Sequence, residues 1–374
     1  MVTSKITELT LAMGRIPLKT KSLQPAYKAP QSGQTIDLTV IVPAYNEAGF
    51  IADTIRSIQS QTVQPKEIIV VDDHSSDGTG DVARSLGVTV LRPEKNTGSK
   101  AGAQNFALGH VKTEFVMAID ADTTLAPDAI EKLAPAFEDP KVVAACGFVL
   151  PRYVRSMWER GRYIEYLFAF TYYKQVQDYF GKPMISSGCF SMYRTAIVSD
   201  MGGWPNRTMA EDMDLTWSFY EAGHGVRFIP EAVSYPVEPH NYNFMSKQLT
   251  RWSHGFVQNL VLHWRGIIHV PFLRYAVMVA TWDATVASIL FLGGLPIIAI
   301  LTHQPLFLLG YFIDAPAVLV PAAIGAYKRK EIRKMLSSFP SFFVLRIVNS
   351  VFILKAFWQE LILRRSLTVY EKGH

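Results

Sequence analysis

The chain has 374 residues, of which 49% are hydrophobic and 18% charged, and its formal net charge is +5. This length allows two domains or one large domain, and the apolar content is high for a wholly soluble enzyme. The two cysteines, Cys146 and Cys189, are too few for a disulfide framework and favour a reducing compartment.

Apolar and basic residues are concentrated in the C-terminal third. The apolar excess begins after His269, so we expect a soluble part followed by a membrane part. From Ala326 onward, ten basic residues outnumber three acidic ones, which indicates anionic lipid rather than nucleic acid as a partner. The apolar run 9–13 is too short for a signal peptide, and residues 1–37 are expected to form a tail or a surface helix.

Short apolar runs alternate with helical patterns between residues 38 and 119. We expect strands at 38–42, 67–71, 88–91 and 115–119, separated by helices at 50–60, 81–86 and 99–109. This alternation predicts a parallel sheet with helices on both faces. Ligands of such sheets bind beyond the carboxyl ends of the strands, where polar clusters occur at 45–47, 72–73 and 120–122.

Two further helices are expected before the membrane part. Residues 152–180 are aromatic-rich and helical in pattern, and 246–264 is amphipathic, with large apolar residues at three- and four-residue steps. Gln248, Arg251 and Trp252 stand at positions i, i+3 and i+4 of the second helix, so they project near one side.

Two apolar stretches, 272–301 and 305–327, are each long enough to cross a hydrocarbon core of ~30 Å. The short link between them predicts a hairpin, and the basic segment 328–334 predicts that the soluble part is cytoplasmic. A third stretch, 339–363, ends in two arginines that a crossing would place outside. We therefore favour an interfacial or re-entrant helix there, with a third span left open.

Intramembrane acids are costly and often functional. Asp283 and Asp314 lie within the two apolar stretches. They either serve a function or meet polar partners inside the helical bundle, and the sequence leaves both alternatives open.

Three segments carry groups suited to chemistry. Asp120 and Asp122 follow a predicted strand, and such a carboxylate pair suits Mg²⁺ or Mn²⁺ together with substrate phosphates. Residues 96–102 open a helix with glycines and Lys100, which suits an anion such as a diphosphate, although a plain helix cap has the same pattern. Glu211 and Asp212 could supply a general base, or they are acids favoured by a helix N-terminus.

Five motifs occur in series: Pro43-Ala44-Tyr45-Asn46-Glu47, Val71-Asp72-Asp73, Asp120-Ala121-Asp122, Ala210-Glu211-Asp212 and Gln248-x-x-Arg251-Trp252. In this order the chain resembles the family-2 inverting glycosyltransferases, in particular their processive membrane branch of poly-N-acetylglucosamine, hyaluronan, chitin and cellulose synthases. The resemblance implies a GT-A-like α/β nucleotide-sugar domain at 38–240. An amphipathic interface helix at 241–268 and an α-helical membrane region at 269–374 would follow it.

The resemblance assigns eight residues to a UDP-sugar donor: Pro43, Tyr45, Glu47, Asp73, Lys100, Asp120, Gln248 and Arg251. Within this set, Tyr45 and Asp73 would hold the uracil, and Gln248 with Arg251 would steady the diphosphate. Asp122, with Asp120, would ligate the Mg²⁺ or Mn²⁺ ion.

The resemblance also implies a catalytic and an acceptor side. Asp212, beside Glu211, would be the base that deprotonates the acceptor hydroxyl. The acceptor path would be lined by Gly188, Cys189 and Phe190, with Trp252 packing under the acceptor sugar.

The function implied is transfer of a sugar, with UDP-N-acetylglucosamine as the best candidate donor, to a growing polysaccharide by an integral membrane enzyme. Three departures favour the alternative of a single transfer to a lipid-linked acceptor. No transmembrane pattern precedes residue 38, Ala210 stands where Thr or Gly is frequent, and two clear spans are few for a channel unless the chain forms a homo-oligomer. A non-catalytic scaffold and a nucleotidyltransferase are the hypotheses from other classes.

Overall fold

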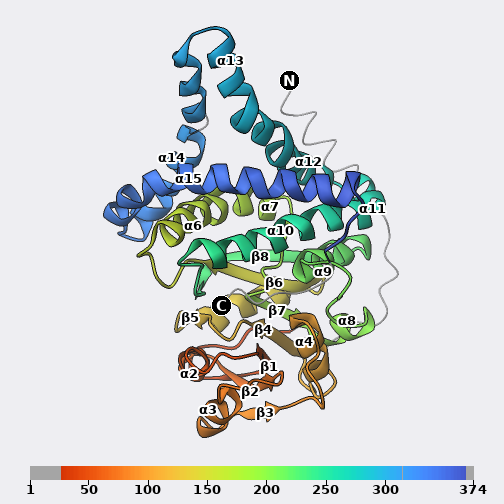
Figure 1. The fold of residues 1–374 in the computed structure, drawn as a ribbon. Helices are drawn as coiled ribbons and strands as arrows, with labels where there is room; N and C mark the ends of the chain where they lie inside the picture. The colour runs from red at the N-terminus through yellow and green to blue at the C-terminus, as the bar shows by residue number, and fades with distance from the viewer. Residues whose placement is uncertain (1–26, 314, 368–374) are drawn as a thin grey trace, which may run out of the picture.

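Eight strands form one mixed sheet (Figure 1) in a computed structural model that describes residues 27–313 and 315–367. The expectations for residues 1–26 and for Asp314 lie outside these ranges. In chain order the strands are β1 Thr35–Ala44, β2 Gln64–Asp72, β3 Thr89–Leu91, β4 Phe115–Ile119, β5 Thr124–Leu125, β6 Val142–Val149, β7 Phe190–Arg194 and β8 Gly225–Tyr235. They are arranged in the order β3-β2-β1-β4-β7-β6-β8-β5.

The four strands expected from the apolar runs form the parallel half of this sheet, β3-β2-β1-β4. The other half of the sheet, for which no strands are predicted, is mixed: β7 pairs antiparallel with both β4 and β6, β5 pairs antiparallel with β8, and β6 pairs parallel with β8. β7 follows a long helical excursion and enters the sheet from the opposite end. Apolar runs specify strands but carry no information about this reversal.

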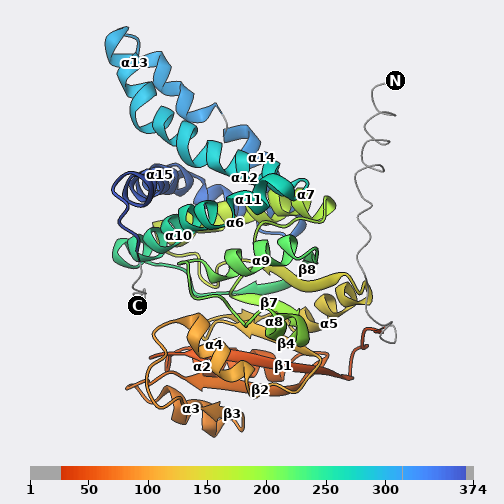
Figure 2. The same ribbon diagram turned by 90° about the vertical axis from the view of Figure 1, so that its right-hand side faces the viewer.

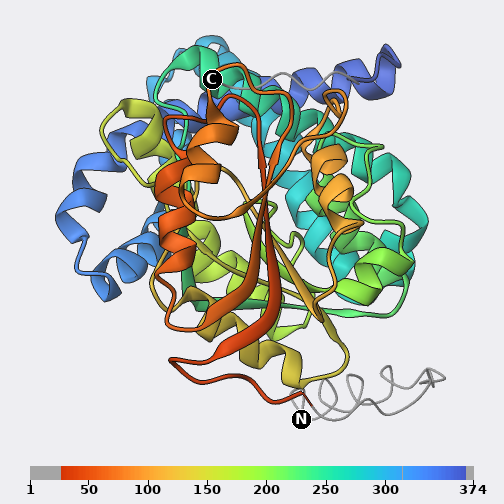
Figure 3. The ribbon, with the colours of Figure 1, turned by 90° about the horizontal axis from the view of Figure 1, so that it is seen from below.

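Helices cover both faces of the parallel half, as the pattern predicts. Because side chains alternate along a strand, Val40 and Val42 of β1 pack with α2 (Ile51–Gln59), whereas Ile41 packs in a second core that includes α4 (Lys100–Leu108). Figure 3 shows these two helices on opposite sides of β1 and β2. The remaining short helices of this domain are α3 Thr79–Ser85, α5 Ala129–Leu133, α8 Thr195–Asp200 and α9 Glu211–Glu221.

The aromatic-rich segment forms two helices joined by a π-helical turn. α6 (Met157–Phe168) begins with a capping box, in which the Ser156 hydroxyl accepts from the Glu159 N–H and the Glu159 carboxylate accepts from the Ser156 N–H. The π-helical turn Ala169–Tyr173 leads into α7 (Lys174–Tyr179). The helix therefore begins five residues later than the pattern 152–180 predicts, at the point where the cap satisfies its free N–H groups.

α10 (Tyr242–Leu262) is the amphipathic helix, and it starts earlier than predicted because Asn241 caps it by accepting from the Phe244 N–H at 2.9 Å. It lies beside α6 above the sheet (Figures 1 and 2). The short α11 (Trp264–His269) then leads to the apolar helices.

Three helices in the described ranges are long and apolar enough to cross a membrane: Leu273–Leu301, Pro305–Lys328 and Ile332–Ile362. The first comprises α12 (Leu273–Trp282) and α13 (Leu295–Leu301) joined through π-helical turns, and the second ends in α14 (Ala315–Lys328). Together they form the expected hairpin, which projects away from the body (Figures 1 and 2). The third contains α15 (Ile332–Phe357) and lies across the body instead.

Candidate active site

Lys100, the first residue of α4, brings three separated motifs together. Its ammonium donates to the Gly188 carbonyl at 2.9 Å, forms an ion pair with Asp120, and lies 3.8 Å from Glu211 Oε1. Burial alone would lower the pKa of Lys100, but the charges of Asp120 and Glu211 outweigh it and raise this pKa. Lys100 is therefore a fixed positive charge between the end of β4, the 186–189 loop and the start of α9.

Asp212 lies in the first turn of α9, directly opposite this loop. One carboxylate oxygen accepts from the Gly188 N–H at 2.8 Å, and the other accepts from the Met213 N–H at 2.8 Å. The absence of a side chain at Gly188 favours this close approach, because a Cβ there would lie 3.1 Å from Asp212 Oδ2 and 3.3 Å from Lys100 Nζ. The carboxylate is thus held in one orientation while remaining partly open to solvent.

Glu211 precedes Asp212 at the N-terminus of α9. Burial raises its pKa, the charge of Lys100 opposes this, and Asp212 adds to it. Arg251 also lowers the pKa of Glu211 electrostatically, which indicates that its guanidinium acts on the same site. Glu211 and Asp212 are therefore acids at a helix N-terminus, as one alternative holds. They also lie among charged groups from other segments, which is what a functional site requires.

A close contact between α10 and Ala210 sets the position of these acids. A Cβ on Gly255 would lie 2.6 Å from the Ala210 side chain and 2.8 Å from its backbone nitrogen. Asn259 adds hydrogen bonds to the Ala210 carbonyl at 3.3 Å and to the Gly255 carbonyl at 2.9 Å. Gly255 thus allows α10 to pass directly over Ala210, the residue at which the chain departs from the family pattern.

Asp122 lies near several other carboxylates beyond the end of β4. Burial raises its pKa well above the ordinary value, and the charges of Asp120, Glu47 and Glu238 raise it further. Within 27–313 and 315–367, no cluster of three or more His, Cys, Asp or Glu residues is arranged as a complete metal site. Mg²⁺ is nevertheless commonly held by two carboxylates, with water and phosphate oxygens completing its coordination. The mutual repulsion of Asp122 and its neighbouring carboxylates therefore fits a bound divalent cation.

The first two motifs lie at the neighbouring strand ends. Tyr45 follows β1 and is 44% exposed, so its ring is accessible to a ligand. Both carboxylate oxygens of Asp73 accept from Thr97, from its N–H and its hydroxyl, each at 2.8 Å. In this structure Asp73 therefore fixes the loop before α4. Glu47 is buried, and its N–H donates to the Thr79 hydroxyl at 2.8 Å, while Pro43 lies within β1.

The predicted acceptor residues differ in their exposure. Gly188 lies at the site and Cys189 is partly exposed, and burial followed by the charge of Asp120 raises the pKa of the Cys189 thiol. Phe190 is fully buried as the first residue of β7 and packs in the core beneath the site. It does not line an open path here, because strand alternation turns its ring inward.

Arg162 of α6 is a residue that sequence reasoning missed. It is 3% exposed, donates to the Gln248 side-chain oxygen at 2.8 Å, and lies 4.6 Å above the Trp252 ring. Its charge is balanced by Glu165 at 2.7 Å and by Glu238 at 3.6 Å. This arginine belongs to none of the five motifs. A charged residue inside an aromatic-rich helix is unusual, because arginine is rarely buried unless it is paired, and this could have indicated a buried ion pair.

A second cluster of polar side chains, centred on the buried Asp214 and His263, lies behind α9. Asp214 accepts two hydrogen bonds from Arg207, at 2.9 and 2.8 Å, and His263 bridges Asp214 at 3.0 Å and Glu221 at 2.9 Å. Burial opposes the charge of His263, but the hydrogen bonds to the two acids raise its pKa above 6.5. This group fixes α9 against α10 and α11.

We expect the contribution of His263 to stability to depend on pH. A raised pKa in the folded state means that the stabilisation is present below about pH 6.5 and is lost as pH rises through the folded pKa, by about 1.4 kcal/mol for each unit of the shift. His263→Gln should therefore lower the thermal midpoint most at pH 6, with a smaller deficit at pH 9. His224, whose pKa burial lowers, is the matched control, and His224→Gln should give the opposite trend. A deficit for His263→Gln that is constant with pH would contradict the assignment.

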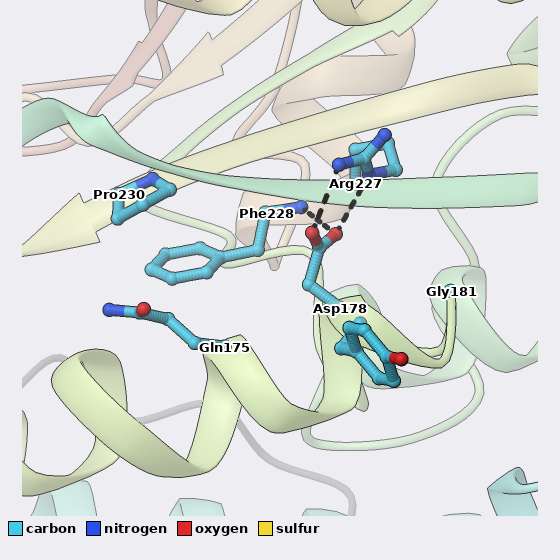
Figure 4. A pocket seen from close by; sticks show the side chains of 7 residues that line it. Gln175, Asp178, Gly181, Arg227, Phe228 and Pro230 are labelled. Atoms are coloured by element: carbon cyan, nitrogen blue, oxygen red, sulfur yellow. Dashed lines mark hydrogen bonds and ion pairs between the residues drawn. The ribbon is translucent and has the colours of Figure 1, made fainter.

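An open pocket elsewhere contains none of the predicted site residues (Figure 4). Its polar wall is Asp178, which accepts from Arg227 at 3.0 and 3.1 Å and from the Phe228 N–H at 2.7 Å. These three bonds satisfy the carboxylate, so we place the candidate site at the strand ends and not here.

The fold and the clustered motifs define the class of protein as a glycosyltransferase of GT-A type. A mannosyltransferase from Pyrobaculum calidifontis, solved with GDP-Man and Mn²⁺, has the same fold, with a TM-score of 0.57 and 20% identity over 91% of each chain. Residues 39–202 match the family model of Glycosyl transferase family 2. This part of the chain therefore resembles the family that the motifs predict.

Curated relatives extend this similarity beyond the family model. A poly-β-1,6-N-acetyl-D-glucosamine synthase of Staphylococcus aureus is 28% identical over 223 residues, which is 58% of this chain and 54% of the relative. A Staphylococcus epidermidis protein of the same name is 28% identical over 227 residues, 59% of this chain and 55% of the relative. The chain therefore spans about half the length of the curated relatives it matches.

Proposed function

We propose that this protein transfers a sugar, with inversion, from a UDP-sugar to the hydroxyl of a growing polysaccharide at a membrane. The observation that carries the proposal is the arrangement of Asp212, Gly188 and Lys100 at the strand ends. A carboxylate held by two N–H groups lies there beside a fixed cation. The names of the Staphylococcus relatives support N-acetylglucosamine as the sugar.

In this proposal Asp212 accepts the proton of the acceptor hydroxyl as it attacks the anomeric carbon. Its hydrogen bonds from Gly188 and Met213 hold the carboxylate in one orientation. Attack from the face opposite the leaving group inverts the anomeric centre, so no covalent sugar–enzyme intermediate forms. Trp252, 39% exposed, offers its free face to the acceptor sugar while Arg162 supports the other.

The donor side stabilises the departing nucleoside diphosphate. Lys100 supplies a fixed positive charge, and Arg251 and Gln248 would contact the diphosphate from α10. Tyr45, Pro43, Glu47 and Asp73 would shape the nucleotide end of the site. Asp73 would do so through the Thr97 loop as well as through direct contact.

Asp120 and Asp122 would hold Mg²⁺ or Mn²⁺ in this proposal. When bound, such an ion offsets negative charge on the diphosphate as the glycosidic bond breaks. The repulsion among Asp122, Asp120 and Glu47 supports this assignment, because a cation would relieve it.

We expect Asp122→Ala to abolish the increase in UDP affinity that Mn²⁺ produces. One of the two carboxylate ligands is removed, and an affinity loss of about 10–100-fold in the presence of metal is expected from changes near a metal site. Calorimetry of UDP binding with and without Mn²⁺ measures this. Asp200→Ala, an exposed aspartate at the end of α8, is the control. If Asp122→Ala retains the full metal effect, the ligand role is wrong.

The second candidate is a single transfer to a lipid-linked acceptor. It is favoured by the hairpin that projects from the body, since two helices alone do not enclose a glycan. Polymer secretion would then require a homo-oligomer or further subunits. We place the catalytic domain on the cytoplasmic side, because the basic segment after α14 follows the positive-inside tendency.

Purified protein in lipid nanodiscs, given Mn²⁺ and a panel of labelled UDP- and GDP-sugars, tests these alternatives. We expect transfer from UDP-N-acetylglucosamine into a polymer with release of UDP. A product that is entirely extractable into organic solvent and carries one sugar would favour the lipid acceptor. Release of pyrophosphate would identify a nucleotidyltransferase, and the absence of any transfer would favour a scaffold.

A further inference from the structure

The third apolar helix, α15 with its π-helical extension Trp358–Ile362, is held by the catalytic domain along its whole length. At its N-terminal end, the Tyr163 hydroxyl donates to Glu331 Oε2 at 2.8 Å. The Arg329 guanidinium, in the turn before the helix, lies 3.9 Å from the centre of the Phe148 ring. Both partners belong to the catalytic domain, since Tyr163 lies in α6 and Phe148 in β6.

The middle of α15 packs tightly on α6. A Cβ on Gly161 would lie 2.9 Å from Leu345 and 3.0 Å from the Ser341 carbonyl, so the two helices touch at a glycine. Asn349 donates to Glu165 at 2.5 Å, and Glu165 is the ion-pair partner of Arg162. This contact joins α15 to the network that supports Gln248 and Trp252.

The C-terminal end is bonded to α10. His254 contacts Glu360 at 2.6 Å and Gln359 at 3.0 Å through its two ring nitrogens. Gln258 donates to Glu360 at 2.8 Å and to the Leu367 carbonyl at 3.0 Å. Residues from 331 to 367 are therefore attached to the catalytic domain and to α10, over a helix of roughly 45 Å at ~1.5 Å per residue.

The outward face of α15 is apolar, and its exposed charges are all positive. Exposed apolar side chains recur at helical spacing: Leu336, Val344, Ile347, Val351, Trp358 and Ile362. The exposed cations in and around the helix are Lys328, Lys330, Arg333, Lys334, Lys355, Arg364 and Arg365. The two acids of this segment, Glu331 and Glu360, are engaged by Tyr163 and His254 on the protein side.

From these contacts we infer that α15 lies in the surface of the bilayer and does not cross it, and that its cations bind anionic lipid headgroups. A crossing would carry α6 and α10 into the hydrocarbon with it, together with the Arg162–Glu165 ion pair and the polar contacts of His254, and lipid is a poor solvent for such groups. In the interface, the apolar stripe enters the membrane while the cations face phosphate groups. Only the hairpin would then enter deeply, and the end of α15 would share a side with the catalytic domain.

Depth measurements distinguish the two placements directly. Nitroxide labels are attached to Leu336→Cys, Ile347→Cys and Trp358→Cys in the full chain reconstituted in anionic vesicles, with labelled wild-type protein as the blank for Cys146 and Cys189. An interfacial helix gives one shallow depth for all three labels. A span gives the greatest depth at 347 and shallow depths on opposite surfaces at 336 and 358, and this result would overturn the inference.

Side-specific labelling with an impermeant maleimide in sealed vesicles gives a second readout. Ser366→Cys should react from the same side as Ser85→Cys, an exposed position of the catalytic domain, and reaction from the opposite side would refute the inference. The lipid part is tested by Arg364→Gln/Arg365→Gln. This double substitution should decrease the depth of the label at position 358 in anionic vesicles and leave its depth unchanged in zwitterionic vesicles. An equal effect in both would exclude recognition of the anionic headgroup.

Discussion

Replacing Asp212 by Asn is expected to lower kcat by about 10²–10⁴-fold, the range that a positioned general base contributes, while leaving donor binding intact. The amide has nearly the shape of the carboxylate, and its oxygen can still accept one of the two hydrogen bonds from Gly188 and Met213. It cannot take a proton from the acceptor hydroxyl. The loss should therefore appear in turnover and not in the affinity for the nucleotide-sugar.

Two measurements separate this role from a structural one. UDP binding by calorimetry and the thermal midpoint of Asp212→Asn should both stay close to those of the wild-type protein. Asp200→Asn, at the exposed end of α8, is the matched control, because it makes the same substitution away from the site. Near-normal transfer by Asp212→Asn would refute the base assignment.

The second large effect is expected for Arg162→Met, which should lower the free energy of unfolding by about 3–5 kcal/mol, as breaking a buried ion pair does. The change leaves the buried Glu238 and the half-buried Glu165 without their shared cation and removes the bond to Gln248. Trp252 also loses the guanidinium that supports its ring. We therefore expect a raised KM for the acceptor in whatever fraction of the protein folds.

Arg160→Met is the control for this prediction, because it makes the same substitution two residues away in α6, where no ion pair within the described ranges involves that arginine. Arg162→Met/Glu238→Gln should recover part of the stability, since the second change removes one unpaired charge. The unfolding midpoint in detergent measures both effects. If Arg162→Met and Arg160→Met lower the unfolding midpoint equally, the contacts of Arg162 do not hold α6 to α10.

The local elements and the order of the motifs could be predicted because each depends on neighbouring residues. The strand 115–119 has the predicted bounds in the structure, since five consecutive apolar residues before Asp120 admit one interpretation. The carboxyl ends of parallel strands meet at one edge, so the convergence of Tyr45, Asp73 and Asp120 followed from the strand pattern alone. The hairpin followed from hydropathy and the short link between its helices.

Other features depend on residues that are far apart in the chain. The antiparallel entry of β7, the burial of Phe190 and the choice of Arg162 as the partner of Gln248 and Trp252 have no local pattern. The placement of α15 is of the same kind. Its composition allows a span, and only its bonds to Tyr163, Glu165 and His254 attach it to one side.

The sequence by itself thus predicted the class of fold, a candidate base and an apolar hairpin long enough to cross a membrane, because motif spacing and hydropathy are properties of the chain. The tertiary structure alone decided how Asp212 is aimed, through Gly188 and the contact of Gly255 with Ala210. It also decided that the buried Arg162 lies against Gln248 and Trp252. Hydrogen bonds and close packing between distant segments exist only after folding, and these interactions fix the geometry of the site.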